Sequence, residues 1–210
     1  GISGAGPLMH VPLAEVRRIF DVNVFGLLAV TQAFLPLLGA RRNCPYPPGR
    51  IVNISSISGG LVFPFVGAYG ASKHAVEALT DGLRRELSIY KIGVIAIEPG
   101  NIRTPIWEKS ASIDRRYTAT DYAPILAKLP LIVAEMVRKG DPVERVSVAV
   151  HKAIAAARPK TRYPLTWLWR CSRVLGDRAL DRLTGSAMGA EMRLEKTTSS
   201  VPGSSALRLL

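Results

Sequence analysis

The sequence predicts an α/β fold built on parallel strands. Two short apolar runs, residues 50–57 and Gly93–Glu98, are rich in β-branched residues, as strands buried on both faces of a sheet are. A long helical pattern lies between them, from Gly67 to about Tyr90. Strand, helix and strand of these lengths form a βαβ unit, whose strands are parallel and whose crossover is right-handed.

Length and composition agree with one globular domain. The chain has 210 residues and is 48% hydrophobic. No apolar run approaches the roughly 18 residues of a membrane span, and no secretory signal opens the chain. Cys44 and Cys171 are too few and too far apart for a disulfide framework or a metal site. We therefore expect no metal, no secretion, and a place in the cytoplasm or an organelle interior.

The charge balance is strongly basic, with 28 Lys and Arg against 16 Asp and Glu. Much of the excess lies in scattered arginines after Lys109. Such a surface is either simply solvated or attractive to an anionic partner. Because no RNA-binding or zinc-finger spacing accompanies it, we expect no nucleic-acid partner.

The first strand is preceded by a glycine-rich loop and a long helix. Residues 1–7 could be a phosphate cradle or a plain connecting loop, and the loop fits better, because a dinucleotide fingerprint needs a strand before it and a helix directly after it. Apolar residues then recur every three or four positions over residues 13–38, which predicts a helix. Asn23 lies inside it, although Asn amides compete for backbone hydrogen bonds. Asn23 is therefore either tied to its own helix or functional.

Helical patterns resume after the second strand, at residues 119–139 and 142–157. Asp141 and Pro142 predict an N-cap followed by proline at the first helical position. Residues 161–164 predict a short strand. The expected domain organisation is a catalytic domain over residues 1–163, a helical extension over 164–194 and a disordered tail over 195–210.

The helical extension has an apolar stripe at residues 167–183, with arginines off the stripe. Four interpretations fit this pattern. It could be an interfacial helix, a partner-binding helix, a helix that closes over a substrate cleft, or further core.

A phenol, an amine and a hydroxyl suggest a proton-transfer site. Tyr69 and Lys73 are four residues apart and therefore lie on one face of the helix. A phenol has a pKa of about 10, which a nearby cation lowers. Ser55 and Ser56 end the first strand, where open α/β sheets bind their ligands. None of the other five tyrosines is followed by a lysine at this spacing.

Five pieces in order resemble the short-chain dehydrogenase/reductase family over residues 1–162. They are Val-Asn-Val at 22–24, Val-Asn-Ile-Ser-Ser at 52–56, Tyr-Gly-Ala-Ser-Lys at 69–73, Glu-Pro-Gly at 98–100 and Thr-Pro at 104–105. The resemblance implies the C-terminal part of a Rossmann-type, doubly wound parallel sheet. It also implies NAD(P)-dependent interconversion of an alcohol and a carbonyl.

The resemblance assigns roles to the matching residues. Tyr69 is the general acid/base, and Ser56, thirteen residues before it, orients the substrate carbonyl. Lys73 binds the nicotinamide ribose and tunes Tyr69, while Asn23 holds a water in the proton relay. Gly1 matches the end of the family's Asn-Ala-Gly turn. The implied cofactor-binding residues are Gly1, Asn23, Tyr69, Lys73, Pro99, Gly100, Ile102 and Thr104.

The opening residues and the run from Glu98 to Pro105 look like the branch that acts on retinoids, steroids and hydroxybutyrate. This likeness implies a small apolar alcohol or carbonyl substrate. Family dimers typically pack through the helices that contain Asn23 and Tyr69, so the resemblance also implies a homo-oligomer.

The sequence departs from the family at its beginning. The family's first four strands, its TG-x-x-x-G-x-G turn and the residue that selects NAD or NADP are not in it. We expect a stretch of a longer enzyme, inactive alone, with the strand at residues 50–56 as an open, aggregation-prone edge. The alternatives are a non-catalytic binding or dimerisation protein, and a basic membrane-peripheral protein that uses residues 162–183.

Overall fold

The computed structural model, which describes residues 1–107 and 114–187, contains a parallel sheet. Its strands are β1 (Arg50–Ile54), β2 (Gly93–Glu98) and β3 (Arg162–Pro164), in the order β1-β2-β3. Val52 is opposite Ile95, and Ile97 is opposite Tyr163. The predicted α/β fold and all three predicted strands are confirmed.

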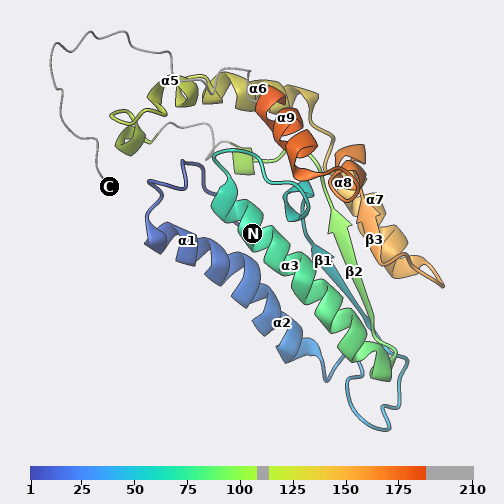
Figure 1. The fold of residues 1–210 in the computed structure, drawn as a ribbon. Helices are drawn as coiled ribbons and strands as arrows, with labels where there is room; N and C mark the ends of the chain where they lie inside the picture. The colour runs from blue at the N-terminus through green and yellow to red at the C-terminus, as the bar shows by residue number, and fades with distance from the viewer. Residues whose placement is uncertain (108–113, 188–210) are drawn as a thin grey trace, which may run out of the picture.

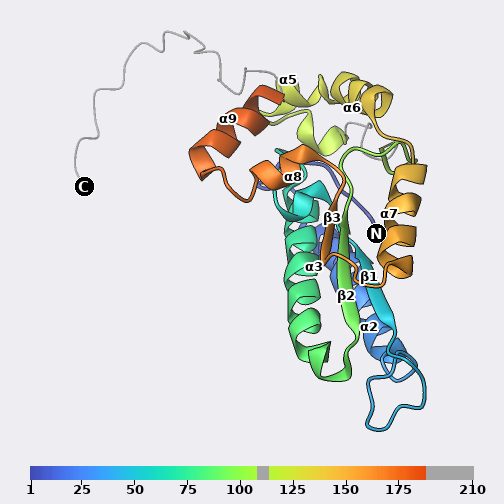
Figure 2. The same cartoon turned by 90° about the vertical axis from the view of Figure 1, so that its right-hand side faces the viewer.

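Helices cover both faces of the sheet (Figures 1 and 2). On one face lie α1 (Leu13–Phe20), α2 (Gly26–Phe34) and the crossover helix α3 (Gly67–Glu86). On the other lies α7 (Glu144–Ala155). Val94 packs towards α3, whereas Ile95 and Ile97 pack against α7. Because β2 is covered on both faces, its sequence is continuously apolar rather than alternating.

The predicted helix over residues 13–38 contains a π-helical turn, Asp21–Phe25, between α1 and α2. Asn23 lies within this turn and is buried. Single π turns inside α-helices are frequent at functional sites.

The predicted helix over residues 119–139 is divided into α5 (Ala123–Leu126) and α6 (Leu129–Lys139). Pro130 lies in the first turn of α6, where it is tolerated, but its ring cannot continue a helix from the turn before. A short 3₁₀ turn, Arg115–Tyr117, precedes α5.

The predicted N-cap at Asp141 is wrong, because α7 begins at Glu144. The Asp141 carboxylate instead forms an ion pair with Arg145. Its backbone N–H donates to the carbonyl oxygen of Asn101, 2.9 Å away. These contacts hold Asp141 in an extended connection before the helix.

The chain ends its described part with α8 (Trp167–Cys171) and α9 (Asp177–Ala187). Leu180 of α9 and the buried Trp169 of α8 pack with Ile57 and Leu61, beside the carboxyl end of β1. Trp167 is 67% exposed. This packing agrees with a helix over the cleft or further core, while the tail at 195–210 lies outside the described residues. No helix in the described ranges is long and apolar enough to cross a bilayer.

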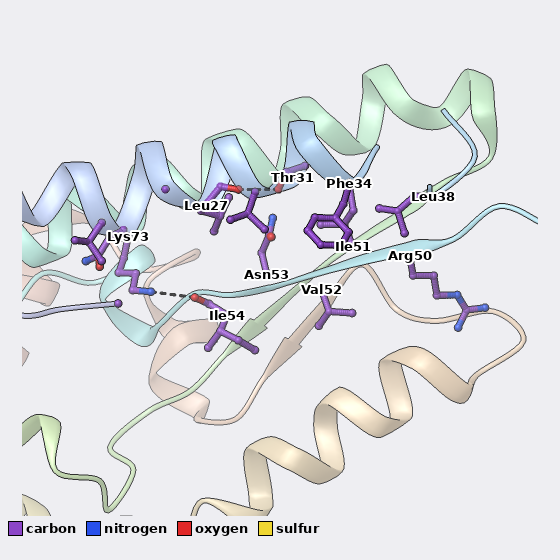
Figure 3. A pocket seen from close by; sticks show the side chains of 15 residues that line it. Leu27, Thr31, Phe34, Leu38, Arg50, Ile51, Val52, Asn53, Ile54 and Lys73 are labelled. Carbon is purple, nitrogen blue, oxygen red and sulfur yellow. Dashed lines mark hydrogen bonds between the residues drawn. The ribbon is translucent and has the colours of Figure 1, made fainter. Parts of the chain in front are cut away.

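Within the described residues, β1 is an edge strand, as expected. Beside it and α2 runs a groove of about 560 Å³, and Figure 3 shows the exposed strand along it. Val30 and Phe34 of α2 and Ile54 of β1 are between 43% and 61% exposed. An edge of unpaired backbone groups beside apolar side chains is a template for self-association.

We expect Ile54→Lys to reduce self-association, because a lysine on an exposed edge opposes pairing with another strand. Static light scattering over a concentration series checks this. Ile89→Lys is the control, since Ile89 is 77% exposed but lies beyond α3, in the turn Leu87–Tyr90. If both substitutions reduced self-association equally, the exposed edge of β1 would not be its origin.

Candidate active site

The candidate site lies where β1 and β2 end. Ser56 follows β1, and its hydroxyl accepts a hydrogen bond from the Ser58 N–H at 3.1 Å. The N–H of Ile57 donates to the carbonyl oxygen of Pro99 at 2.7 Å. The ends of the two strands are therefore tied together at the level of Ser56.

Tyr69 lies in the first turn of α3 and faces Ser56. A hydrogen bond with Ser56 lowers the pKa of the Tyr69 phenol, but burial has the larger effect and raises it. The pair predicted from sequence is thus brought together by the turn that connects β1 with α3. Ser55, the alternative serine, is also buried, and no hydrogen-bond partner for its hydroxyl lies among the described residues.

Lys73 is buried one turn further along α3. Its ammonium donates to the carbonyl oxygen of Ile54 at 2.9 Å, as Figure 3 shows, and lies 5.8 Å from the centre of the Tyr69 ring. Burial lowers the pKa of Lys73 to about 8. The Tyr69 pKa is therefore raised rather than lowered as expected, because burial has the larger effect, Ser56 is the group that lowers it, and the Lys73 ammonium is directed at Ile54.

Asn23 connects three segments rather than binding its own helix. Its Oδ1 accepts from the Ile2 N–H at 2.8 Å, and its Nδ2 donates to the Ile2 carbonyl at 2.9 Å. The same Nδ2 donates to the Ser72 hydroxyl at 3.0 Å. The amide therefore fixes the opening loop against α3.

Ser72 was not predicted from the sequence. It is fully buried, and its hydroxyl donates to the Tyr69 carbonyl oxygen at 2.7 Å. A serine beside Lys73 gives little signal by itself, because its partner Asn23 is 49 residues away. The one available clue to Ser72 was its position inside the Tyr-Gly-Ala-Ser-Lys segment at 69–73.

Of the remaining predicted cofactor residues, Gly1 lies beside Asn23 and Lys73, and the others follow the end of β2. A Cβ on Gly1 would lie 2.7 Å from Asn23 Oδ1 and 3.8 Å from Lys73 Nζ, so Gly1 belongs to the same cluster. A Cβ on Gly100 would lie 3.1 Å from the Thr166 Cβ. Pro99 bonds to Ile57, as described above. Further along, Ile102 is buried in a bridge with Asp141, and Thr104 is half-buried.

A buried charge cluster behind the site was also missed. Arg162 of β3 is ion-paired with Glu77 and Asp81 of α3, and its guanidinium donates to Glu98 Oε1 of β2 at 2.9 Å. The Glu98 side chain is completely buried, and burial raises its pKa to about 8. Arg173 lowers this pKa and Asp81 raises it, both to a smaller extent.

No group of three or more potential metal ligands occurs in the described part of the chain.

The comparisons with known proteins agree with this arrangement. Residues 1–114 match the family model described as short chain dehydrogenase. The chain belongs to the short-chain dehydrogenase family.

Two curated relatives have informative names. The chain is 42% identical over 187 residues to the NADPH-dependent 3-dehydrocapnine reductase of Ornithobacterium rhinotracheale, covering 87% of this chain and 66% of the relative. It is 32% identical over 181 residues to retinol dehydrogenase 16 of Rattus norvegicus, covering 80% of this chain and 54% of the relative. The chain thus spans less than two thirds of the length of these relatives.

Solved structures support the fold. A short-chain dehydrogenase from Streptomyces avermitilis matches with a TM-score of 0.63 at 26% identity, covering 89% of this chain and 64% of that structure. One from Burkholderia phymatum, in complex with NAD, matches with a TM-score of 0.65 at 24% identity, covering 87% of this chain and 64% of that structure. The Rossmann-type α/β fold is confirmed.

Asn23→Ala should lower the free energy of unfolding by about 1–3 kcal/mol, because it leaves buried partners on Ile2 and Ser72 unsatisfied. Urea denaturation measures the change. Gln32→Ala is the control, since Gln32 is exposed on α2. Equal stability of the two variants would show that the Asn23 contacts contribute nothing.

Glu98→Gln should flatten the pH dependence of stability. The folded carboxyl keeps its proton up to about pH 8, whereas the unfolded one loses it near 4.5. Folding therefore takes up a proton between these values, and the free energy of unfolding falls as pH rises through that window. Denaturation across the window should show this slope in the wild type and in the exposed control Glu144→Gln, but not in Glu98→Gln. A slope unchanged by Glu98→Gln would refute the assignment.

Proposed function

We propose that this chain carries the proton-transfer site of an NAD(P)-dependent oxidoreductase that interconverts an alcohol and a carbonyl. The observation that carries the proposal is the placement of the Ser56 side chain beside the Tyr69 phenol, with Lys73 one turn further along the same helix. All three lie at the carboxyl end of a parallel sheet, where such folds bind ligands.

In the proposed mechanism, the substrate oxygen binds between Ser56 and Tyr69. In the reducing direction, Ser56 donates a hydrogen bond to the carbonyl oxygen, and Tyr69 transfers its proton to that oxygen. Bound NAD or NADP would supply the hydride to the carbonyl carbon, or accept it in the reverse direction. In the oxidising direction, Tyr69 accepts the proton of the alcohol hydroxyl.

Lys73 and Asn23 support this chemistry in different ways. With a pKa of about 8, Lys73 is largely charged at neutral pH, and its ammonium favours the phenolate that Tyr69 forms after giving up its proton. Asn23 holds the Gly1–Ile2 backbone beside Lys73. Its Oδ1 accepts one hydrogen bond and keeps a second acceptor site for the relay water.

The residues present fit the nicotinamide end of the cofactor. A Cβ at Gly1 would require the Asn23 side chain to shift, and a Cβ at Gly100 would be a tight contact with Thr166. Gly1, Asn23, Tyr69 and Lys73 would hold the ribose side, and Pro99, Gly100, Ile102 and Thr104 the nicotinamide side. The relatives do not decide between NAD and NADP for this chain.

An apolar substrate is proposed from two observations. The cluster of Ile57, Leu61 and Trp169 begins directly after Ser56 and places apolar side chains on the substrate side. The named relatives act on 3-dehydrocapnine and on retinol.

We propose a homo-oligomer through the helices that contain Asn23 and Tyr69. Phe25, in the turn of Asn23, and Val30, in α2, expose apolar side chains that could pack against a second copy.

Tyr69→Phe in the full-length protein should reduce NAD(P)H-coupled turnover by about 10²–10⁴-fold, because the phenol is the proton donor. Turnover is followed by nicotinamide absorbance with apolar ketones and alcohols. Tyr46→Phe is the control, since the Tyr46 hydroxyl donates to the Pro36 carbonyl in a loop away from the site. Full activity of Tyr69→Phe would refute the proposed role, and a wild type that binds nucleotide without turnover would favour a non-catalytic protein.

A further inference from the structure

We propose that Arg162 is a positioning residue for the candidate active site. Its guanidinium holds the Glu77 carboxylate away from Lys73 and braces the helix that carries Tyr69 against the end of β2. This inference rests on the proposed function, because it concerns the same three catalytic residues.

The first step is the spacing along α3. Tyr69, Lys73, Glu77 and Asp81 follow one another at intervals of four residues, so they lie on one stripe of the helix. Carboxylate and ammonium groups at this spacing commonly form ion pairs. Nevertheless, Lys73 donates to the Ile54 carbonyl, and no described carboxylate forms an ion pair with it.

The second step is the position of the Glu77 carboxylate. Its Oε2 accepts from Arg162 Nη1, and its Oε1 is buried with no hydrogen-bond partner among the described residues. The same guanidinium donates to Glu98 Oε1 at 2.9 Å and to Asp81 Oδ1 at 2.5 Å. Removing Arg162 would leave the largely buried Glu77 carboxylate without its present cation.

Arg162 is also connected to Ser56 through hydrogen bonds at the end of β2. Arg162 bonds to Glu98, and the next residue, Pro99, accepts the hydrogen bond from Ile57, which follows Ser56. Arg162 also bonds to the stripe that carries Tyr69 and Lys73. One guanidinium therefore braces both halves of the candidate site.

Two further arginines, Arg84 and Arg173, lie beside the cluster of Arg162, Glu77, Asp81 and Glu98. Arg84 pairs with Asp81 at 2.6 Å, and Arg173 lies with Arg162 against the ring of Trp169, 5.0 Å and 5.6 Å from its centre. Among the described residues, the other titratable side chain near Lys73 is the Tyr69 phenol. Glu77 is thus the carboxylate nearest in sequence on the Lys73 face of α3.

The test is the titration of Lys73 in the full-length protein, followed by NMR of ¹³C-labelled lysine side chains and assigned with Lys73→Arg. In the wild type, Lys73 should titrate near pH 8. Arg162→Met should raise this pKa by about one unit, because the freed Glu77 carboxylate pairs with Lys73. Arg162→Met/Glu77→Gln should return it to the wild-type value.

Arg162→Lys keeps a cation but loses the fork of donors, so it should give a smaller upward shift and serves if Arg162→Met does not fold. Arg138→Met is the matched control, because Arg138 is exposed on α6 and pairs with Glu135. An unchanged Lys73 titration in the folded Arg162 variants, or a shift that Glu77→Gln does not reverse, would overturn the proposal. The titration needs neither cofactor nor substrate, so its failure is distinct from failure of the Tyr69→Phe turnover test.

Discussion

The parallel pairing of β1 with β2 is the constraint on which the rest of the structure depends. Parallel neighbours cannot be joined by a tight turn, so the chain must return along the sheet through α3. This return places the first turn of α3 beside the end of β1. Tyr69 therefore meets Ser56 at the same edge of the sheet where Pro99 and Gly100 follow β2.

Burial then decides the electrostatics of this edge. The groups that matter, Tyr69, Lys73 and Glu98, are removed from water by the helices on both sides of the sheet, and burial is the largest cause of each pKa shift. In each case burial favours the neutral form. Charged partners such as Arg162 therefore matter more here than they would on the surface, because a buried charge without a partner is costly.

Much of the fold could be predicted because its signals are local. The apolar runs of β1 and β2 and the periodicity of α3 each occupy one continuous segment. The Tyr69 and Lys73 positions followed from their spacing on one helix, and the serine pair from its place after the first strand, whereas the choice of Ser56 over Ser55 came from the resemblance to the family. Asp141 shows the limit of a local signal, because the residue has the right type for a cap but is held elsewhere by Asn101 and Arg145.

The parts that sequence reasoning missed depend on distant contacts. Arg162 meets Glu77 and Glu98 across 85 and 64 residues of sequence, and no periodicity marks such a pairing. The π turn around Asn23 was not predicted either, since Asn23 drew attention as an unusual helix residue but its partners, Ile2 and Ser72, are 21 and 49 residues away. Both features become visible only when the sheet and helices are assembled.

We propose that the site of Ser56 and Tyr69 interconverts an alcohol and a carbonyl by hydride transfer between the bound substrate and NAD(P). The most direct test is deuterium transfer in the full-length protein, from nicotinamide cofactor deuterated at the transferring position to apolar ketones, read by mass spectrometry of the product. The account predicts one deuterium on the former carbonyl carbon of the alcohol. Alcohol product that forms without deuterium from either face of the nicotinamide, or no product from a protein that binds both cofactor and ketone, would contradict it.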